Sequence, residues 1–282
     1  MFDNLASTVK ADFARARFKA FLKRVRNLLA GGSQTLLSYD EIKEKLRIGG
    51  PIYRGVQTVP LEKIAGSLNR YEQFDRAFLP LQDWLARRWE NVDRAFYQDV
   101  SLPPVLLYKV GDVYFVVDGH HRVSVGRQQG QQFIEADVRE CSTKVNITPD
   151  LKVEDLEILG EKVEFLERTA LDRIRPKANI KLTIPGGFDR LLEHIAVHRY
   201  FMGIDLERDI TEQEAVAHWY DKVYLPIVGV IRRSGVLRDF ADKTEGDLYL
   251  WVLDRQRELS TKGRALMSPA RAARDFIDKV EE

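Results

Sequence analysis

The chain has 282 residues, of which 44% are hydrophobic and 31% are charged, so it can bury a core without a disulfide or a structural metal. Its 44 basic and 43 acidic residues give a formal net charge of +1, so only local charge asymmetry can indicate a partner. The single cysteine, Cys141, excludes an internal disulfide and a cysteine-based zinc site. No apolar stretch approaches bilayer length and no apolar signal core opens the chain, which predicts a cytoplasmic protein without a membrane span.

A basic helical arm is predicted for residues 1–50. Apolar side chains recur at three- and four-residue steps over residues 7–30, and the segment Lys10–Arg26 carries seven cations against the single acid Asp12. Such a helix can grip the phosphates of DNA or lie on an anionic membrane surface. We favour a third interpretation, in which an aromatic stripe packs on the same chain or on a second copy in a homodimer. The stripe comprises Phe13, Phe18 and Phe21.

Residues 51–141 are predicted to form a small mixed sheet with helices, which is an α/β (α+β) arrangement. The predicted strands are residues 56–59, 104–108, 113–117 and 133–138, the middle two forming a hairpin. The predicted helices are residues 78–97 and 121–130, after a helical turn that opens at Pro60.

The rest of the chain is predicted to be an acidic connecting segment, residues 142–187, and a mostly helical C-terminal domain, residues 188–282. A helix is expected within the connecting segment at residues 153–171. Capping boxes predict helix starts after Ser38 and Thr211, and Ser268-Pro269 predicts a helix in the tail.

Three histidines in the C-terminal domain have spacing that a metal site can use. His194 and His198 are four residues apart on one predicted helix, His218 lies on the next, and Glu193 is a nearby carboxylate. A match this loose is far more often a set of ordinary histidines. We therefore predict no metal site there.

The segment Asp118-Gly119-His120-His121-Arg122 lies where the predicted hairpin ends and a helix begins. Glycine allows a tight turn, and the first N–H groups of a helix are unpaired and form an anion site. Arg122 can clamp phosphate oxygens, the imidazoles can donate hydrogen bonds, and Asp118 can orient a neighbour or help to hold a metal on a nucleotide. The alternative is an ordinary strand-to-helix turn with Asp118 as its N-cap.

Several separated motifs agree in their order along the chain. They are Val59–Ile64, Asn69-Arg70, Phe74-Asp75, Pro103–Leu107 and Tyr114–Arg122, followed by a helix ending in Gly130. This order resembles the N-terminal domain of ParB proteins, a member of the ParB/sulfiredoxin superfamily. The resemblance covers residues 53–140, less than a third of the chain.

The resemblance implies a nucleotide site whose loop contacts the phosphates. ParB proteins bind CTP and use it to clamp DNA, whereas sulfiredoxins bind ATP and carry a cysteine in this loop. Related free-serine kinases often have the loop sequence Asp-Gly-His-His-Arg, as at residues 118–122 here. This loop contains no cysteine, which argues against sulfiredoxin chemistry, and no helix-turn-helix of the ParB type is evident after the domain.

We therefore expect a site for the phosphates of CTP or ATP, bound with Mg²⁺. The expected nucleotide-binding residues are Gly119, His120, His121, Arg122, Asn69 and Arg70. The candidate catalytic or metal-holding acids are Asp118 and Glu72, since the kinases use a glutamate near the Asn69-Arg70 region. Two functions remain open at this level. One is a regulatory, DNA-associated nucleotide-binding protein, with the Lys10–Arg26 helix as its DNA contact. The other is a nucleotide-dependent kinase of a small hydroxyl compound such as free serine.

Overall fold

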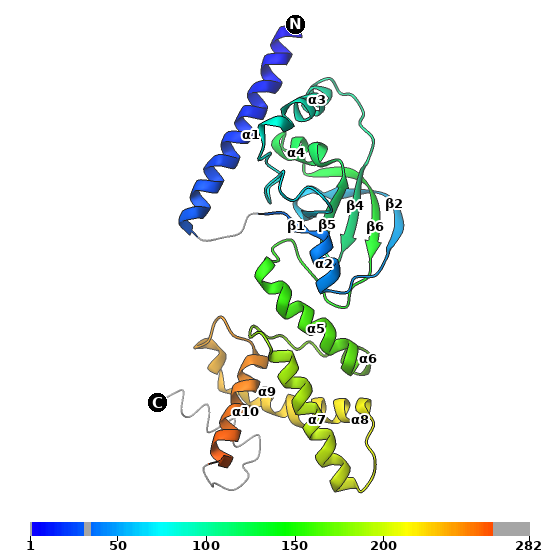
Figure 1. The fold of residues 1–282 in the computed structure, drawn as a ribbon, viewed down its shortest axis with the longest axis vertical. Coiled ribbons are helices and arrows are strands. Elements are labelled where there is room, and N and C mark those ends of the chain that lie inside the picture. Colours follow the sequence, from blue (N-terminus) through cyan, green and yellow to red (C-terminus); the bar gives the residue numbers. More distant parts are fainter. Residues whose placement is uncertain (1, 31–34, 262–282) are drawn as a thin grey trace. The chain divides into compact units, whose positions relative to one another are not determined.

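The computed structural model describes residues 2–30 and 35–261, and it has the mixed α/β architecture that the sequence predicts (Figure 1). The chain divides into two compact units between Leu156 and Glu157, so the predicted connecting segment 142–187 is shared between them. A six-stranded sheet lies in the first unit, whereas the described part of the second unit is helical. The tail helix predicted from Ser268 lies outside the described residues.

The sheet has the strand order β1-β3-β5-β4-β6-β2. β4 and β5 form the predicted antiparallel hairpin, and parallel pairs join β5 to β3, β3 to β1, and β4 to β6. β2 pairs antiparallel with β6 and forms one edge. The strands are β1 (Leu37–Ser38), β2 (Pro51–Pro60), β3 (Ile64–Ser67), β4 (Val105–Val110), β5 (Val113–Asp118) and β6 (Phe133–Cys141).

Strands β1 and β3 are not predicted by the sequence pattern, and β3 is the longer of the two. Its four residues are all buried, so the polar–apolar alternation of a half-exposed strand is missing. A Cβ atom at Gly66 would overlap the Phe115 ring of β5, so glycine allows the two strands to pair at this point. The loop that follows β3 carries Asn69 and Arg70, two of the residues that the sequence predicts for nucleotide binding.

Helices α3 (Ala86–Tyr97) and α4 (His120–Gln128) pack against each other over the main hydrophobic cluster. The fully buried Trp89 of α3 donates its indole N–H to Oγ of Ser124 on α4, at 2.8 Å. The helix predicted from residue 78 begins eight residues later. Phe78 adopts a left-handed φ of 58°, and the Asp75 carboxylate accepts backbone N–H groups inside this turn.

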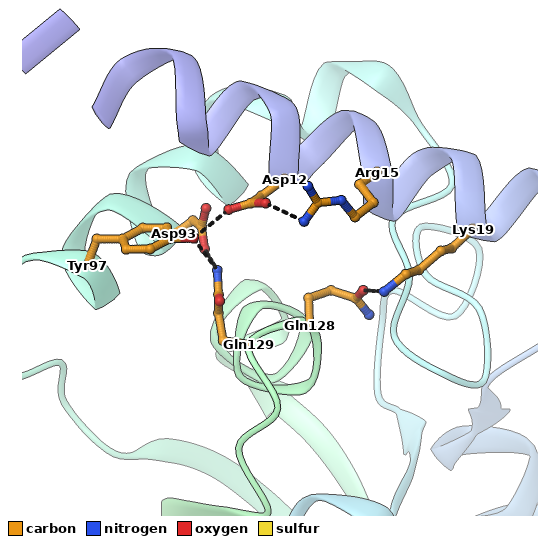
Figure 2. Close-up of polar contacts among 7 residues, drawn as sticks. All are labelled: Asp12, Arg15, Lys19, Asp93, Tyr97, Gln128 and Gln129. Atoms are coloured by element: carbon orange, nitrogen blue, oxygen red, sulfur yellow. Dashed lines mark hydrogen bonds and ion pairs between the residues drawn. The ribbon is translucent and has the colours of Figure 1, made fainter. Parts of the chain in front are cut away.

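Helix α1 (Phe2–Ala30) rests on α3 and the end of α4 (Figure 2). Tyr97 donates to the Asp12 carboxylate at 2.8 Å, and Lys19 donates to Oε1 of Gln128 at 3.0 Å. The predicted aromatic stripe packs only in part. Phe13 is buried beside Trp89, but Phe18 and Phe21 are 59% and 60% exposed, so the expectation that all three pack on the domain is wrong for these two within the chain.

Arg127 is a partly buried cation that fastens α4 to two other segments. Its guanidinium donates to the carbonyl oxygens of Leu61, of Ile64 at 2.6 Å and of Arg76 at 3.1 Å. It also lies over the Phe78 ring, 5.1 Å from the centroid. Burial lowers the pKa of Arg127 to about 10, so the group stays charged at neutral pH.

The described part of the second unit is built from helices around a buried aromatic centre of Trp219, Tyr224 and Tyr249. Thr211 accepts the N–H of Glu214 and caps α8, as its capping box predicts, just as Ser38 caps α2 (Tyr39–Lys45). A π-helical turn, residues 220–224, joins α8 to α9. The helices are α5 (Leu156–Thr169), α6 (Leu171–Ile174), α7 (Gly187–Leu206), α8 (Glu212–Trp219), α9 (Leu225–Ser234) and α10 (Glu245–Thr261).

Across residues 2–30 and 35–261, no helix combines the length and the apolarity needed to cross a membrane.

Replacing Arg127 by Met should lower the free energy of unfolding of the first unit by about 3 kcal/mol, because three backbone carbonyls lose their donor. Hydrogen exchange of the β5 amides measures this loss, since strands in a core exchange by global opening. Arg87→Met, on the exposed side of α3, is the matched control and should change the value by less than about 0.5 kcal/mol. Equal protection in the two variants would contradict the role assigned to Arg127.

Candidate functional site

A concave pocket of about 350 Å³ opens at the N-terminus of α4. Its volume lies within the range of small-ligand sites. The structure brings together six of the eight residues singled out from the sequence, and it adds residues of α3 and of the segment before β4. The lining residues are Arg70, Arg88, Asn91, Val92, Leu102, Pro103, Asp118, Gly119, His120, His121 and Arg122.

Gly119 makes the sharp passage from β5 into α4. It is the N-cap of α4 and has a left-handed φ of 99°, where an L side chain is strained. A Cβ atom there would lie 2.5 Å from Cγ1 of Val105, on the neighbouring strand β4. Glycine is therefore required both by backbone conformation and by space. The first N–H groups of α4 have no partner inside the helix, and the residues that carry them, His120 to Arg122, line the pocket.

His120 is buried and held in one orientation. Its Nε2 atom lies 2.8 Å from Oγ of Ser67, at the end of β3, and that same oxygen accepts the backbone N–H of Arg70. Burial, reinforced by the Arg70 charge, lowers the pKa of His120 to about 3. His120 thus joins β3, its following loop and α4 as a neutral group.

His121 is also buried, but its ring nitrogens are unsatisfied. Its exposed fraction is 9%, and neither nitrogen has a hydrogen-bond partner within the part of the chain that the structure describes. The ring packs edge-on against Phe74, 5.4 Å away between centroids. Burial and the charges of Arg70 and Arg88 lower its pKa to about 4. A buried imidazole without partners is costly, so this residue is a point where a bound group or a small rearrangement would gain a hydrogen bond.

Arg122 closes the turn on itself. Its guanidinium donates to Oδ2 of Asp118 at 2.7 Å and to the carbonyl oxygens of Pro103 and Pro104, the latter at 3.0 Å. The side chain is only 15% exposed, whereas the Asp118 carboxylate is 75% exposed. From the sequence we expect this guanidinium to bind phosphate oxygens, but its N–H groups already donate to protein acceptors. Arg122 therefore acts by holding the turn in position.

Two other arginines are available in its place. Arg70 follows β3 and Arg88 lies on α3, and neither side chain has a hydrogen bond or an ion pair among the described residues. Sequence reasoning missed Arg88 and Asn91. They lie three residues apart on one face of α3, and only the true start of that helix at Ala86 shows which of its residues face α4.

Two of the expected site residues lie away from the pocket. Glu72 and Asn69 are exposed and are not part of the pocket lining, although both belong to the loop that carries Arg70. The loop follows strand β3, which separates it from the helical turn at residues 61–63. Glu72 therefore has no support as a catalytic group.

The histidines of the second unit are occupied with protein partners. His198 Nε2 lies 2.9 Å from Nδ1 of His218, and His194 Nδ1 lies 2.6 Å from the Tyr249 hydroxyl. Within residues 2–30 and 35–261 no group of three His, Cys, Asp or Glu side chains is arranged to hold a metal ion. Cys141 is buried beside the Tyr39 hydroxyl, and burial raises the pKa of its thiol.

The two pocket histidines should stay neutral well below the ordinary imidazole pKa of about 6.5. In the unfolded chain they take up protons near that pH, whereas in the folded protein they do so only near pH 4 and below. The free energy of unfolding therefore falls as the pH drops from about 6.5 to about 4.

An NMR titration of the five histidines checks this directly, with His120→Gln and His121→Gln to assign the signals. The resonances of both residues should hardly move between about pH 7 and about pH 5. A midpoint near 6.5 for either residue would show that its side chain is not buried as described.

No protein-family model matches the chain, and no curated protein matches it either. The geometry and charge of the pocket therefore carry the functional interpretation.

Proposed function

We propose that the pocket at the N-terminus of α4 binds the phosphate groups of a nucleoside triphosphate, CTP or ATP, together with Mg²⁺. The observation that carries the proposal is the convergence of two arginines without protein partners, Arg70 and Arg88, with the first turn of α4 in one concave site. Phosphate is the common ligand that matches a helix N-terminus and paired guanidinium forks. The resemblance of residues 53–140 to the ParB domain supports the same class of ligand.

Each element of the pocket has a distinct part in such binding. The N–H groups that follow Gly119 supply fixed donors and the positive end of the helix dipole. Arg70 and Arg88 supply full charges from two other segments, and the neutral His121 ring adds one N–H donor. Burial, reinforced by the Arg70 charge, holds both imidazole pKa values low; a bound anion would offset that charge, so phosphate and proton uptake should favour each other.

The placement of these groups supports a regulatory role. Arg88 belongs to α3, whereas the helix N-terminus belongs to α4, so a phosphate group between them ties the two helices together. Helix α1 packs on α3, and its Lys19 donates to Gln128 at the end of α4 (Figure 2). A ligand-dependent change in the spacing of α3 and α4 would therefore reach α1 through direct contacts.

A second candidate is a kinase that transfers the terminal phosphoryl group to a small hydroxyl compound such as free serine. Asp118 favours it, because its carboxylate is exposed at the pocket and lies beside the turn that would hold the phosphates. In this reaction the acceptor oxygen bonds to the γ-phosphorus, the bond to the β-phosphate oxygen breaks, and Asp118 takes the hydroxyl proton. Glu72 takes no part in it.

Arg88→Gln and Arg70→Gln should each weaken nucleotide binding by about tenfold or more, because each removes a charge-assisted contact to phosphate. Calorimetry with CTP, ATP and GTP, with and without Mg²⁺, measures the affinities and identifies the base preference. Arg87→Gln on the same helix lies outside the pocket and is the matched control. Affinities that are equal in all three variants would rule out this pocket as the phosphate site.

Asp118→Asn separates the two candidate functions. For a kinase, the variant should retain nucleotide affinity within about threefold but lose phosphoryl transfer by about a hundredfold or more. Phosphoryl transfer is followed by ³¹P NMR with ATP and a panel of serine-like acceptors. A wild-type protein that binds nucleotide and transfers nothing to any acceptor would leave the regulatory function alone standing.

A further inference from the structure

Helix α1 carries a row of large apolar side chains that the described residues of its own unit leave exposed. Phe18, Phe21, Leu22 and Val25 are exposed by 59%, 60%, 51% and 40%. Their spacing of three and four residues places them along one side of the helix. We call these four residues the α1 stripe. An exposed contiguous apolar row of this kind marks an interaction surface.

The α1 stripe lies opposite the side by which the helix is seated. Val9, Phe13, Ala16 and Ala20 are buried on the domain. An α-helix turns by about 100° per residue. Around the helix axis, the buried Ala20 therefore lies roughly 160° from Leu22, and the buried Ala16 lies roughly 160° from Phe18. One side of α1 therefore holds the helix to α3 and α4, and Phe18, Phe21 and Val25 are presented outward. Leu22 is also exposed, but it and Arg26 lie at the edge of a groove that Ala77, Leu79 and Gln128 line from the domain.

Cations border the α1 stripe on both flanks. Arg15 and Arg26 lie about 60–80° from Phe18 on one side, and Arg24 lies about 120° from it on the other. All three are exposed. Arg15 forms an exposed pair with Asp12, the single acid of the segment, and pairs of this kind are weak. The cations nearest the domain have other partners, since Arg17 pairs with Asp83 and Lys19 with Gln128.

We propose that α1 docks the protein on an anionic phospholipid surface, with the α1 stripe inserted at the acyl boundary and Arg15, Arg24 and Arg26 against the headgroup phosphates. An apolar row bordered by cations on both flanks is the pattern by which helices lie in a membrane interface. The docking is peripheral, because the opposite side of α1 stays on the domain. It is independent of the nucleotide proposal.

Two other occupants fit the charge pattern less well. DNA would satisfy the cations but leave Phe18 and Phe21 in contact with water and phosphate. A second α1 would cover the apolar row but bring cations against cations along both flanks, with Asp12 as the single acid of the segment Lys10–Arg26 in each helix to offset them. An anionic bilayer satisfies both the apolar and the charged parts of the surface.

Helix α7 offers an internal comparison. Val197, Tyr200, Phe201 and Ile204 form an exposed apolar row of the same spacing, with exposed fractions of 52–67%. Its exposed neighbours include the acids Glu193 and Asp205, so this row lacks the cationic border. If apolar exposure alone caused lipid binding, both helices would contribute. If the cationic border is required, only α1 does.

The test is co-sedimentation of the full chain with phosphatidylcholine vesicles that contain about 30% phosphatidylglycerol, and with pure phosphatidylcholine vesicles. The wild-type protein should bind the anionic vesicles, bind neutral ones at least about tenfold more weakly, and dissociate as salt rises to about 0.5 M. Phe18→Ser/Phe21→Ser and, separately, Arg24→Glu/Arg26→Glu should reduce binding to the anionic vesicles by about tenfold or more.

Tyr200→Ser/Phe201→Ser is the matched control and should retain binding. Circular dichroism of the variants should be unchanged, because the replaced side chains are already exposed. Failure of the wild type to bind anionic vesicles overturns the proposal. So does a dimer in sedimentation velocity that Phe18→Ser/Phe21→Ser converts to monomer while vesicle binding persists, because a second copy then covers the α1 stripe. Tight duplex DNA binding without vesicle binding would assign the cations to nucleic acid instead.

Discussion

The partly buried guanidinium of Arg127 is the constraint on which the arrangement of the first unit depends. A charge that is partly withdrawn from water is stable only when its donors are satisfied, and here the acceptors come from the turn at residues 61–63, from the start of β3 and from the loop after it. α4, β3 and the loop that carries Arg70 are therefore held in one geometry. His120, at the N-terminal end of α4, contacts the same three segments. Helix α4 is therefore fixed at both of its ends, and so is the pocket at its N-terminus.

In the proposed phosphate site, Arg70 and Arg88 keep their charges free of partners among the described residues. Both imidazoles are neutral, and Arg122, the cation closest in sequence to the turn, is consumed by Asp118 and two proline carbonyls. The positive potential that remains comes from backbone dipoles and from Arg70 and Arg88. A preorganised site of this kind would reduce the conformational entropy that side chains lose when a ligand binds.

The sequence was most informative where one local rule determines structure. The hairpin of β4 and β5, the turn at Gly119 and the caps at Ser38 and Thr211 follow from residue type and spacing, and the structure confirms them. Strand β3 could not be predicted in this way, because a fully buried strand of mostly small residues lacks the alternation of polar and apolar side chains. The positions of Arg88 and Glu72 depend on where a loop ends and which way it turns. Those are long-range outcomes of packing, and no local pattern encodes them.

Helix α1 also shows the limit of reading a periodic pattern. Its aromatic residues look like a single stripe in sequence, but Phe13 points into the domain while Phe18 and Phe21 point away. Because the two faces belong to one continuous helix, the angle between them around the helix axis is fixed by the residue spacing. Inserting a single residue after Ala20 would leave composition and charge almost unchanged, yet it would rotate Phe21, Leu22 and Val25 by about 100° relative to the seated residues. The helical register of α1 thus determines which side chains this helix exposes. Homologous chains with the same exposed side of α1 should therefore conserve the length of this segment more strictly than its residues.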